Sequence, residues 1–154
     1  MTVPVLGRNH LFFISTNGTT WTPINGVTSF SMPTENEVAD AATFNSPWGG
    51  ELVTEVRLSV ELEGRFLSDP TSNERDWGQQ QVELACRQVG APGLRWLRIE
   101  TVEQQGGQPV GRIEGRGIFK NFRTEGEKTD LANWSVEFVY YGEPTFSGRW
   151  GAGS

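Results

Sequence analysis

Hydrophobic and polar residues alternate along residues 55–66 for longer than chance would easily produce. The apolar positions are Val56, Leu58, Val60, Leu62 and Phe66, and the polar positions are Glu55, Arg57, Ser59, Glu61, Glu63 and Arg65, with Gly64 as the single gap. Successive side chains of a β-strand point to opposite faces, so this period predicts a strand with one face in a core. The polar face either lies in water, as on an ordinary antiparallel sheet, or lines a space enclosed by several copies of the chain.

Shorter extended segments come before this strand. Residues 11–14 form an apolar run, and the Asn-Gly pairs at 17–18 and 25–26 favour tight turns because they tolerate a positive φ. Residues 21–24 and 27–32 are therefore expected to be strands.

Residues 33–52 show no periodicity and predict a long loop. Unstructured loops of this length are uncommon in compact domains and tend to be functional or disordered. Phe44 and Trp48 either meet a partner surface or fold back on their own domain. The candidate contact residues of the loop are Glu35, Glu37, Asp40, Phe44 and Trp48.

One α-helix is expected over about residues 72–89. Residues 71–74, Thr-Ser-Asn-Glu, fit a capping box, and Gly90 followed by Pro92 is a stop signal. The apolar stripe of the helix includes Val82, Cys86 and Val89, so Cys86 is interpreted as a small buried side chain and not a nucleophile.

Three further strands are expected after the helix, at residues 94–101, 110–123 and 131–141. In the last strand Trp134, Val136 and Phe138 share one face and are expected in the core. The prediction is one β-domain over residues 11–144, with an N-terminal arm at 1–10 and a flexible tail at 145–154.

The charge balance argues against a protein that binds nucleic acid for affinity. The net charge is -6, and phosphate binding needs clustered Lys and Arg. Residues 95–123 are nevertheless net positive and residues 34–63 net negative. Opposed patches on one chain permit head-to-tail contacts between copies, and ordinary surface salt pairing is the alternative.

Candidate chemistry is sparse. The chain has one cysteine, Cys86, and one histidine, His10, which leaves no disulfide and few ways to build a metal or acid–base site. No phosphate-binding loop motif is present. We therefore expect no enzyme activity, catalytic residue, metal or cofactor, and no membrane insertion or signal-directed secretion.

Taken in order, these elements resemble the major tail tube proteins of long, non-contractile-tailed bacteriophages, the siphophages. The segments that carry the resemblance are residues 21–30, the acidic run into Asp40-Ala41-Ala42-Thr43-Phe44, residues 60–69, the helix at 76–84 and residues 134–138. The resemblance covers nearly all of residues 11–144. It implies a mainly β fold, a sandwich or barrel of antiparallel sheets with one flanking helix.

In that family each copy gives four strands to a continuous inner barrel, with six copies per ring and rings stacked head to tail. Twenty-four strands at a tilt of roughly 40° give a backbone diameter of about 48 Å, wide enough for duplex DNA. The resemblance implies that Glu55, Arg57, Ser59, Glu61, Glu63 and Arg65 face a mainly acidic lumen through which viral DNA passes without specific binding. It also implies that the long loop reaches the neighbouring subunit or ring.

The implied partners are other copies of the chain, a tape measure protein and other tail proteins. The implied location is the virion tail, after assembly in the host cytoplasm. Two alternatives stay open: a tube protein of a phage-derived injection or secretion device, and a carbohydrate- or receptor-binding β-domain of the tail tip.

Overall fold

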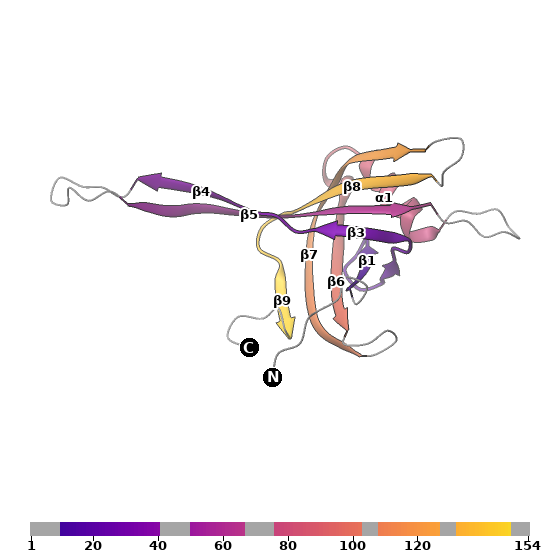
Figure 1. Cartoon of the computed structure of the whole chain (residues 1–154), viewed down its shortest axis with the longest axis horizontal. Helices are drawn as coiled ribbons and strands as arrows, with labels where there is room; N and C mark the ends of the chain where they lie inside the picture. The colour runs from indigo at the N-terminus through magenta and orange to yellow at the C-terminus, as the bar shows by residue number, and fades with distance from the viewer. Residues whose placement is uncertain (1–9, 41–49, 67–75, 103–107, 127–131, 149–154) are drawn as a thin grey trace, which may run out of the picture.

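The computed structural model describes residues 10–40, 50–66, 76–102, 108–126 and 132–148 (Figure 1). The predicted fold class is confirmed: the chain is mainly β, its strands pair antiparallel, and an α-helix flanks them. The elements in chain order are β1 (His10–Ser15), β2 (Thr22–Pro23), β3 (Val27–Ser31), β4 (Thr34–Asp40), β5 (Glu51–Arg65), α1 (Trp77–Cys86), the short 3-10 helix η2 (Ala91–Gly93), β6 (Leu94–Val102), β7 (Pro109–Glu125), β8 (Asn133–Tyr140) and β9 (Thr145–Gly148).

The strands form one strongly curved sheet in the order β2-β1-β6-β7-β8-β5-β3, with β9 added to β7. In Figure 1, β3, β5 and β8 run across the view while β6 and β7 cross behind them. The curvature brings the two ends of the sheet together, because Phe30 of β3 lies 4.7 Å from the ring of His10 and 5.3 Å from that of Phe12 on β1. A barrel-like core is enclosed in this way.

The core is built from the inward positions of the alternating strands. Val60 and Leu62 of β5, and Phe138 of β8, are fully buried, and Trp134 and Val136 are nearly so. Leu58 and Phe66 are half-buried against the same cluster. Burying such side chains contributes roughly 1.5–3 kcal/mol each, so the period of two largely determines which face of the sheet turns inward.

Two residues expected in the core are exposed. Val56 is 64% exposed because the first half of β5 extends beyond the barrel, and Val89 is 91% exposed because α1 ends at Cys86. Within α1 Val82 is fully buried, while Cys86 is half-buried.

The helix is shorter than predicted. Its N-cap is Asp76, whose carboxylate accepts a hydrogen bond from the backbone N–H of Gln79 at 3.2 Å. The same carboxylate accepts a bond from the Asn25 side chain at 2.9 Å, which ties the start of α1 to the turn before β3. The predicted capping box at 71–74 lies outside the described residues.

The predicted long loop at 33–52 is wrong at both ends. Thr34–Asp40 forms β4, which pairs with the first half of β5, so residues 34–40 and 51–52 are strand. The polar composition of β4 hid this strand, because pairing with β5 and not burial holds it in place. The predicted tail is also wrong over 145–148, where β9 pairs with β7.

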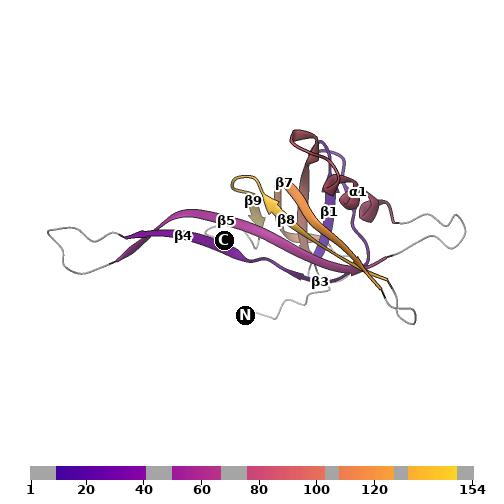
Figure 2. The ribbon, with the colours of Figure 1, turned by 90° about the horizontal axis from the view of Figure 1, so that it is seen from above.

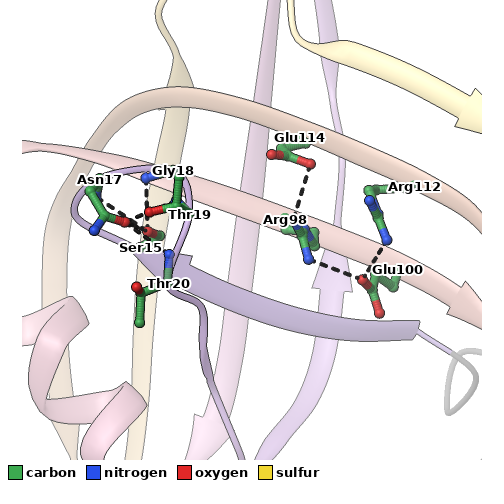
Figure 3. A network of polar contacts seen from close by, with 9 residues as sticks. All are labelled: Ser15, Asn17, Gly18, Thr19, Thr20, Arg98, Glu100, Arg112 and Glu114. Atoms are coloured by element: carbon green, nitrogen blue, oxygen red, sulfur yellow. Dashed lines mark hydrogen bonds and ion pairs between the residues drawn. The ribbon is translucent and has the colours of Figure 1, made fainter.

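The Asn17-Gly18 turn joins β1 to β2 as expected, with Gly18 at φ +78°. The Ser15 hydroxyl accepts from the Gly18 N–H at 2.9 Å, and the Asn17 side chain accepts from the N–H groups of Thr19 and Thr20, each at 2.9 Å (Figure 3). The second turn, at Asn25-Gly26, leads into β3, which pairs with β5 and not with β2.

Candidate functional site

The outward side of β5 carries all six residues for which the family resemblance implies a place in a channel. Glu61 and Glu63 are exposed and accept hydrogen bonds from the hydroxyls of Ser31 and Ser29 on β3, at 3.3 and 3.2 Å. Ser59 shares this side but is only 6% exposed. Glu55 and Arg57 lie on the part of β5 that extends beyond the barrel, so they occupy the same side at a different height.

Strands β8 and β7 widen this surface. Glu137 lies opposite Glu61, and Ser135 opposite Glu63; Lys120 and Arg123 follow on β7. The Lys120 ammonium is 3.9 Å from the Glu137 carboxylate, so these side chains share one side of the sheet. We call this surface the polar face; its charged members are Glu35, Glu37, Glu55, Arg57, Glu61, Glu63, Arg65, Lys120, Arg123, Glu125 and Glu137.

A β-bulge places the cations of β7. Lys120 pairs with Glu137 and Arg123 with Ser135, so the strand gains one residue between them. Asn121 lies in the bulge with a φ of +57°, which is uncommon for a residue with a side chain. Without the extra residue, positions three apart would point to opposite faces. The bulge therefore brings Arg123 onto the polar face and turns Phe122 towards the core, where it stacks on Trp134.

Strand β4 and the first half of β5 form a two-stranded arm that protrudes from the barrel (Figures 1 and 2). One side of the arm continues the polar face, since Glu35 lies opposite Arg57 and Glu37 opposite Glu55. Arg57 also reaches Glu55 at 3.2 Å. The two sides of the arm thus differ, because a strand alternates its side chains.

The other side of the arm exposes three valines next to Asn36, with Asp40 opposite Glu51 at its end, and we call it the apolar side. Val38 lies opposite Val53, and Asn36 opposite Val56, so the three valines share one side. They are 50%, 56% and 64% exposed. Sequence reasoning missed Val38 and Val53, although their β-branched side chains were a signal for strand structure. Of the other predicted loop contacts, Asp40 ends β4, and Phe44 and Trp48 lie outside the described residues.

A second charged cluster lies on β6 and β7 and is internally neutralised. Arg98 contacts Glu100 at 3.5 Å and Glu114 at 3.4 Å, and Arg112 contacts Glu100 at 3.3 Å (Figure 3). The Arg98 guanidinium also lies 4.0 Å from the centre of the Trp21 ring. The cluster pairs two arginines with two carboxylates of the same segment, so the net positive charge predicted for residues 95–123 stays with its other cations.

The described residues offer little chemistry. They contain no group of three or more His, Cys, Asp and Glu side chains that could hold a metal ion. Burial raises the pKa of the Cys86 thiol to about 11, so little thiolate is present at neutral pH. In the same part of the chain, no helix is long and apolar enough to cross a membrane.

No protein-family model matches the sequence, and no curated protein matches it. The structure is similar to solved structures of tails and tubes. A chain from the tail of an empty gene transfer agent particle, refined with C6 symmetry, matches with a TM-score of 0.66 and 15% identity over 94% of this chain and 100% of that one. The SPP1 tail tube protein matches with a TM-score of 0.71 and 12% identity over 95% and 80%.

The likeness extends to injection systems. A chain of the sheath–tube complex of PVC, an extracellular contractile injection system, matches with a TM-score of 0.65 and 8% identity over 94% and 92%. At these identities the comparison shows a common fold. This chain has the fold of tail tube proteins.

Proposed function

We propose that this protein is a structural subunit of a bacteriophage tail tube, whose copies form rings that stack into a hollow tube. The observation that carries the proposal is the two-sided arm. Its polar side continues the polar face past the end of the barrel, and its apolar side has nothing to cover it in a single copy. An exposed apolar strand pair with open edges is a liability unless a partner covers it.

The occupant of that apolar side is a second copy. In one copy the barrel covers the inward side of β5 only from Leu58 onward. When copies stack, the barrel of a neighbouring copy supplies the missing layer over Val38, Val53 and Val56. The arm is then the element that joins adjacent subunits or rings, which is the role expected for residues 33–52.

The polar face lines the channel in this arrangement. Its charged members are seven carboxylates and four cations, so each copy contributes a net charge of -3. This net negative charge repels the phosphates of DNA, and few cations are available to replace the counterions of DNA. A channel of this character lets a duplex pass without holding it, which suits delivery of viral DNA.

The resemblance to siphophage tail tube proteins supports more specific assignments. The tube belongs to the tail of a virion with a long non-contractile tail, its rings contain six copies, and its partners include a tape measure protein and other tail proteins. The subunit has no enzymatic role. Assembly takes place in the host cytoplasm.

A related function fits the same fold. Injection systems are among the structural neighbours, so a tube that delivers protein cargo is the second candidate. The two differ in what passes through the channel and in the genes that encode their partners.

Electron microscopy of the purified protein tests the proposal. We expect hollow tubes or closed rings with a central channel, at protein concentrations high enough for the arm of one copy to bind the next copy. A protein that stays monomeric at all concentrations and salt conditions, and instead binds glycans on a glycan array, would favour the tail-tip domain and contradict a tube subunit.

A further inference from the structure

The polar face has two open edges in the described part of the chain. On one side, β3 and β4 pair with β5 and have no strand beyond them. On the other side, β7 pairs with β6 only up to Ile118, so residues 119–125 pair with β8 alone. The Phe122 backbone bonds to the Cys86 thiol of α1, and along the rest of each edge no described strand covers the backbone, so another strand can pair there.

The strand directions allow these two edges to meet. Across the face, β3, β5, β8 and β7 alternate in direction, since each neighbouring pair is antiparallel. Strand β7 therefore runs opposite to β3. Copies related by a rotation about a common axis can place the β7 edge of one beside the β3–β4 edge of the next, and the continued sheet stays antiparallel.

Charge differs between the two edges. The β3–β4–β5 side carries Glu35, Glu37, Glu55, Glu61 and Glu63 against Arg57 and Arg65. The β7 edge carries Lys120 and Arg123 against Glu125. One edge is thus net negative and the other net positive, within a face that is acidic as a whole.

The two cations of the β7 edge are available to a partner. Lys120 is 46% exposed and its contact with Glu137 is long, at 3.9 Å. Arg123 and Glu125 are 71% and 69% exposed, and a pair so exposed contributes little. The bulge at Asn121 has the effect of placing both cations on this side of the sheet.

We propose that Lys120 and Arg123 of one copy pair with the acidic β3–β4–β5 side of the neighbouring copy, and that this charge match selects which edges join around the ring. The inference rests on the proposed function, because it needs copies arranged side by side. The partner is a second copy of this chain because the chain carries both edges and both signs, and a head-to-tail contact of this kind closes into a ring when the rotation permits.

Two charge-reversal variants, assembled separately and as a mixture, test this pairing. In the first variant, Lys120→Glu and Arg123→Glu make both edges acidic. In the second variant, Glu61→Lys and Glu63→Lys make the β3–β4–β5 side basic, so both edges of this variant are basic. The readouts are the concentration at which tubes appear and the particles seen by electron microscopy, at low and at high salt.

We expect each variant alone to need at least about tenfold more protein than the wild type before tubes appear at low salt. An equimolar mixture should assemble close to the wild-type concentration, because every interface then joins an acidic edge to a basic one. Raising the ionic strength should bring the concentration at which each variant forms tubes closer to that of the wild type, since exposed charges are screened.

A matched control is the ion pair at the end of α1, with Arg87→Glu and Glu83→Lys. Their charged groups lie 2.6 Å apart and belong to neither edge strand, so this variant should assemble as the wild type does. Circular dichroism and thermal unfolding of each variant show whether the monomer keeps its fold.

The outcomes distinguish a failure of the proposed function from a failure of the charge match. If the wild type forms no tube or ring, the proposed function and this inference both fall. If the wild type assembles and either charge variant assembles equally well alone, the tube remains and the charge match is wrong. A mixture that assembles no better than its folded components also overturns the charge match.

Discussion

At the scale of single residues, Gly64 shows how tightly β5 packs. A Cβ on this glycine would lie 2.6 Å from the Gly26 carbonyl oxygen and 2.7 Å from the Trp134 ring. Trp134 is 2% exposed and its indole N–H donates to the Arg65 carbonyl at 3.2 Å, so the ring has little room to move. Close packing therefore explains why a glycine, Gly64, interrupts the alternation of β5.

We predict that Gly64→Ala lowers the free energy of unfolding by roughly 1–3 kcal/mol, the usual cost of overpacking a core. Chemical denaturation of the unassembled protein measures the change. Gly50→Ala is the matched control at the start of the same strand, because no atom lies within 4 Å of the added carbon. Equal stability of the two variants would show that the contact with Trp134 and Gly26 is not restrictive.

At the scale of elements, the β4–β5 arm is a strand pair whose apolar side is uncovered in one copy and is proposed to contact a second copy. Its valines do little for the stability of one copy, because all three are at least half exposed. Their burial can be gained only on assembly. Substitutions on this side of the arm should therefore change assembly without changing the stability of one copy, unlike substitutions in the core.

We predict that Val53→Asp with Val56→Asp changes the stability of the monomer by no more than about 0.5 kcal/mol, as is usual for surface substitutions. The same variant should form no tubes, because two carboxylates would then be buried without partners. Electron microscopy and sedimentation measure assembly. Thr54→Ser, between the two valines, should assemble normally, and tubes of normal length from the double aspartate variant would contradict the role of the arm.

At the scale of the whole molecule, the curved sheet gives the protein an inner and an outer side once copies enclose a channel. In the proposed tube the polar face of β3, β5, β8 and β7 lies inside, while α1 packs on the opposite side of the sheet. Reagents of different size distinguish these sides.

We predict that Glu61→Cys, in a Cys86→Ser background, reacts with a small maleimide in assembled tubes but not with a protein-sized maleimide conjugate. Arg87→Cys at the C-terminal end of α1, where the Arg87 side chain is 71% exposed, should react with both reagents. Dissociated subunits should react at both positions with either reagent. Equal reaction of Glu61→Cys with the large conjugate on intact tubes would place the polar face outside.

Much of the fold was predictable because burial imposes a period. The strands at 55–65 and 133–140 and the helix around Val82 follow from regular spacing of apolar residues. The Asn-Gly turns follow from the positive φ that glycine permits. The common side of the candidate channel residues on β5 followed from the same alternation, whereas their channel role came from the resemblance to tail tube proteins.

Other features left no such signal. Strand β4 is polar and β9 is short, so neither shows a hydrophobic pattern, and each is held by hydrogen bonds to a strand distant in sequence. The cations of β7 needed the bulge at Asn121 to reach the polar face. A bulge is recognised from pairing with another strand and not from the residue itself.

The sequence by itself determined which side of β5 is polar, because alternation along a strand needs no knowledge of neighbours. Only the tertiary structure decided how far the barrel covers the other side. Val60 and Val56 occupy equivalent positions in the pattern, yet one is fully buried and the other 64% exposed. The difference arises because burial depends on what packs against a strand, and the strands and helix of one copy reach only half of β5.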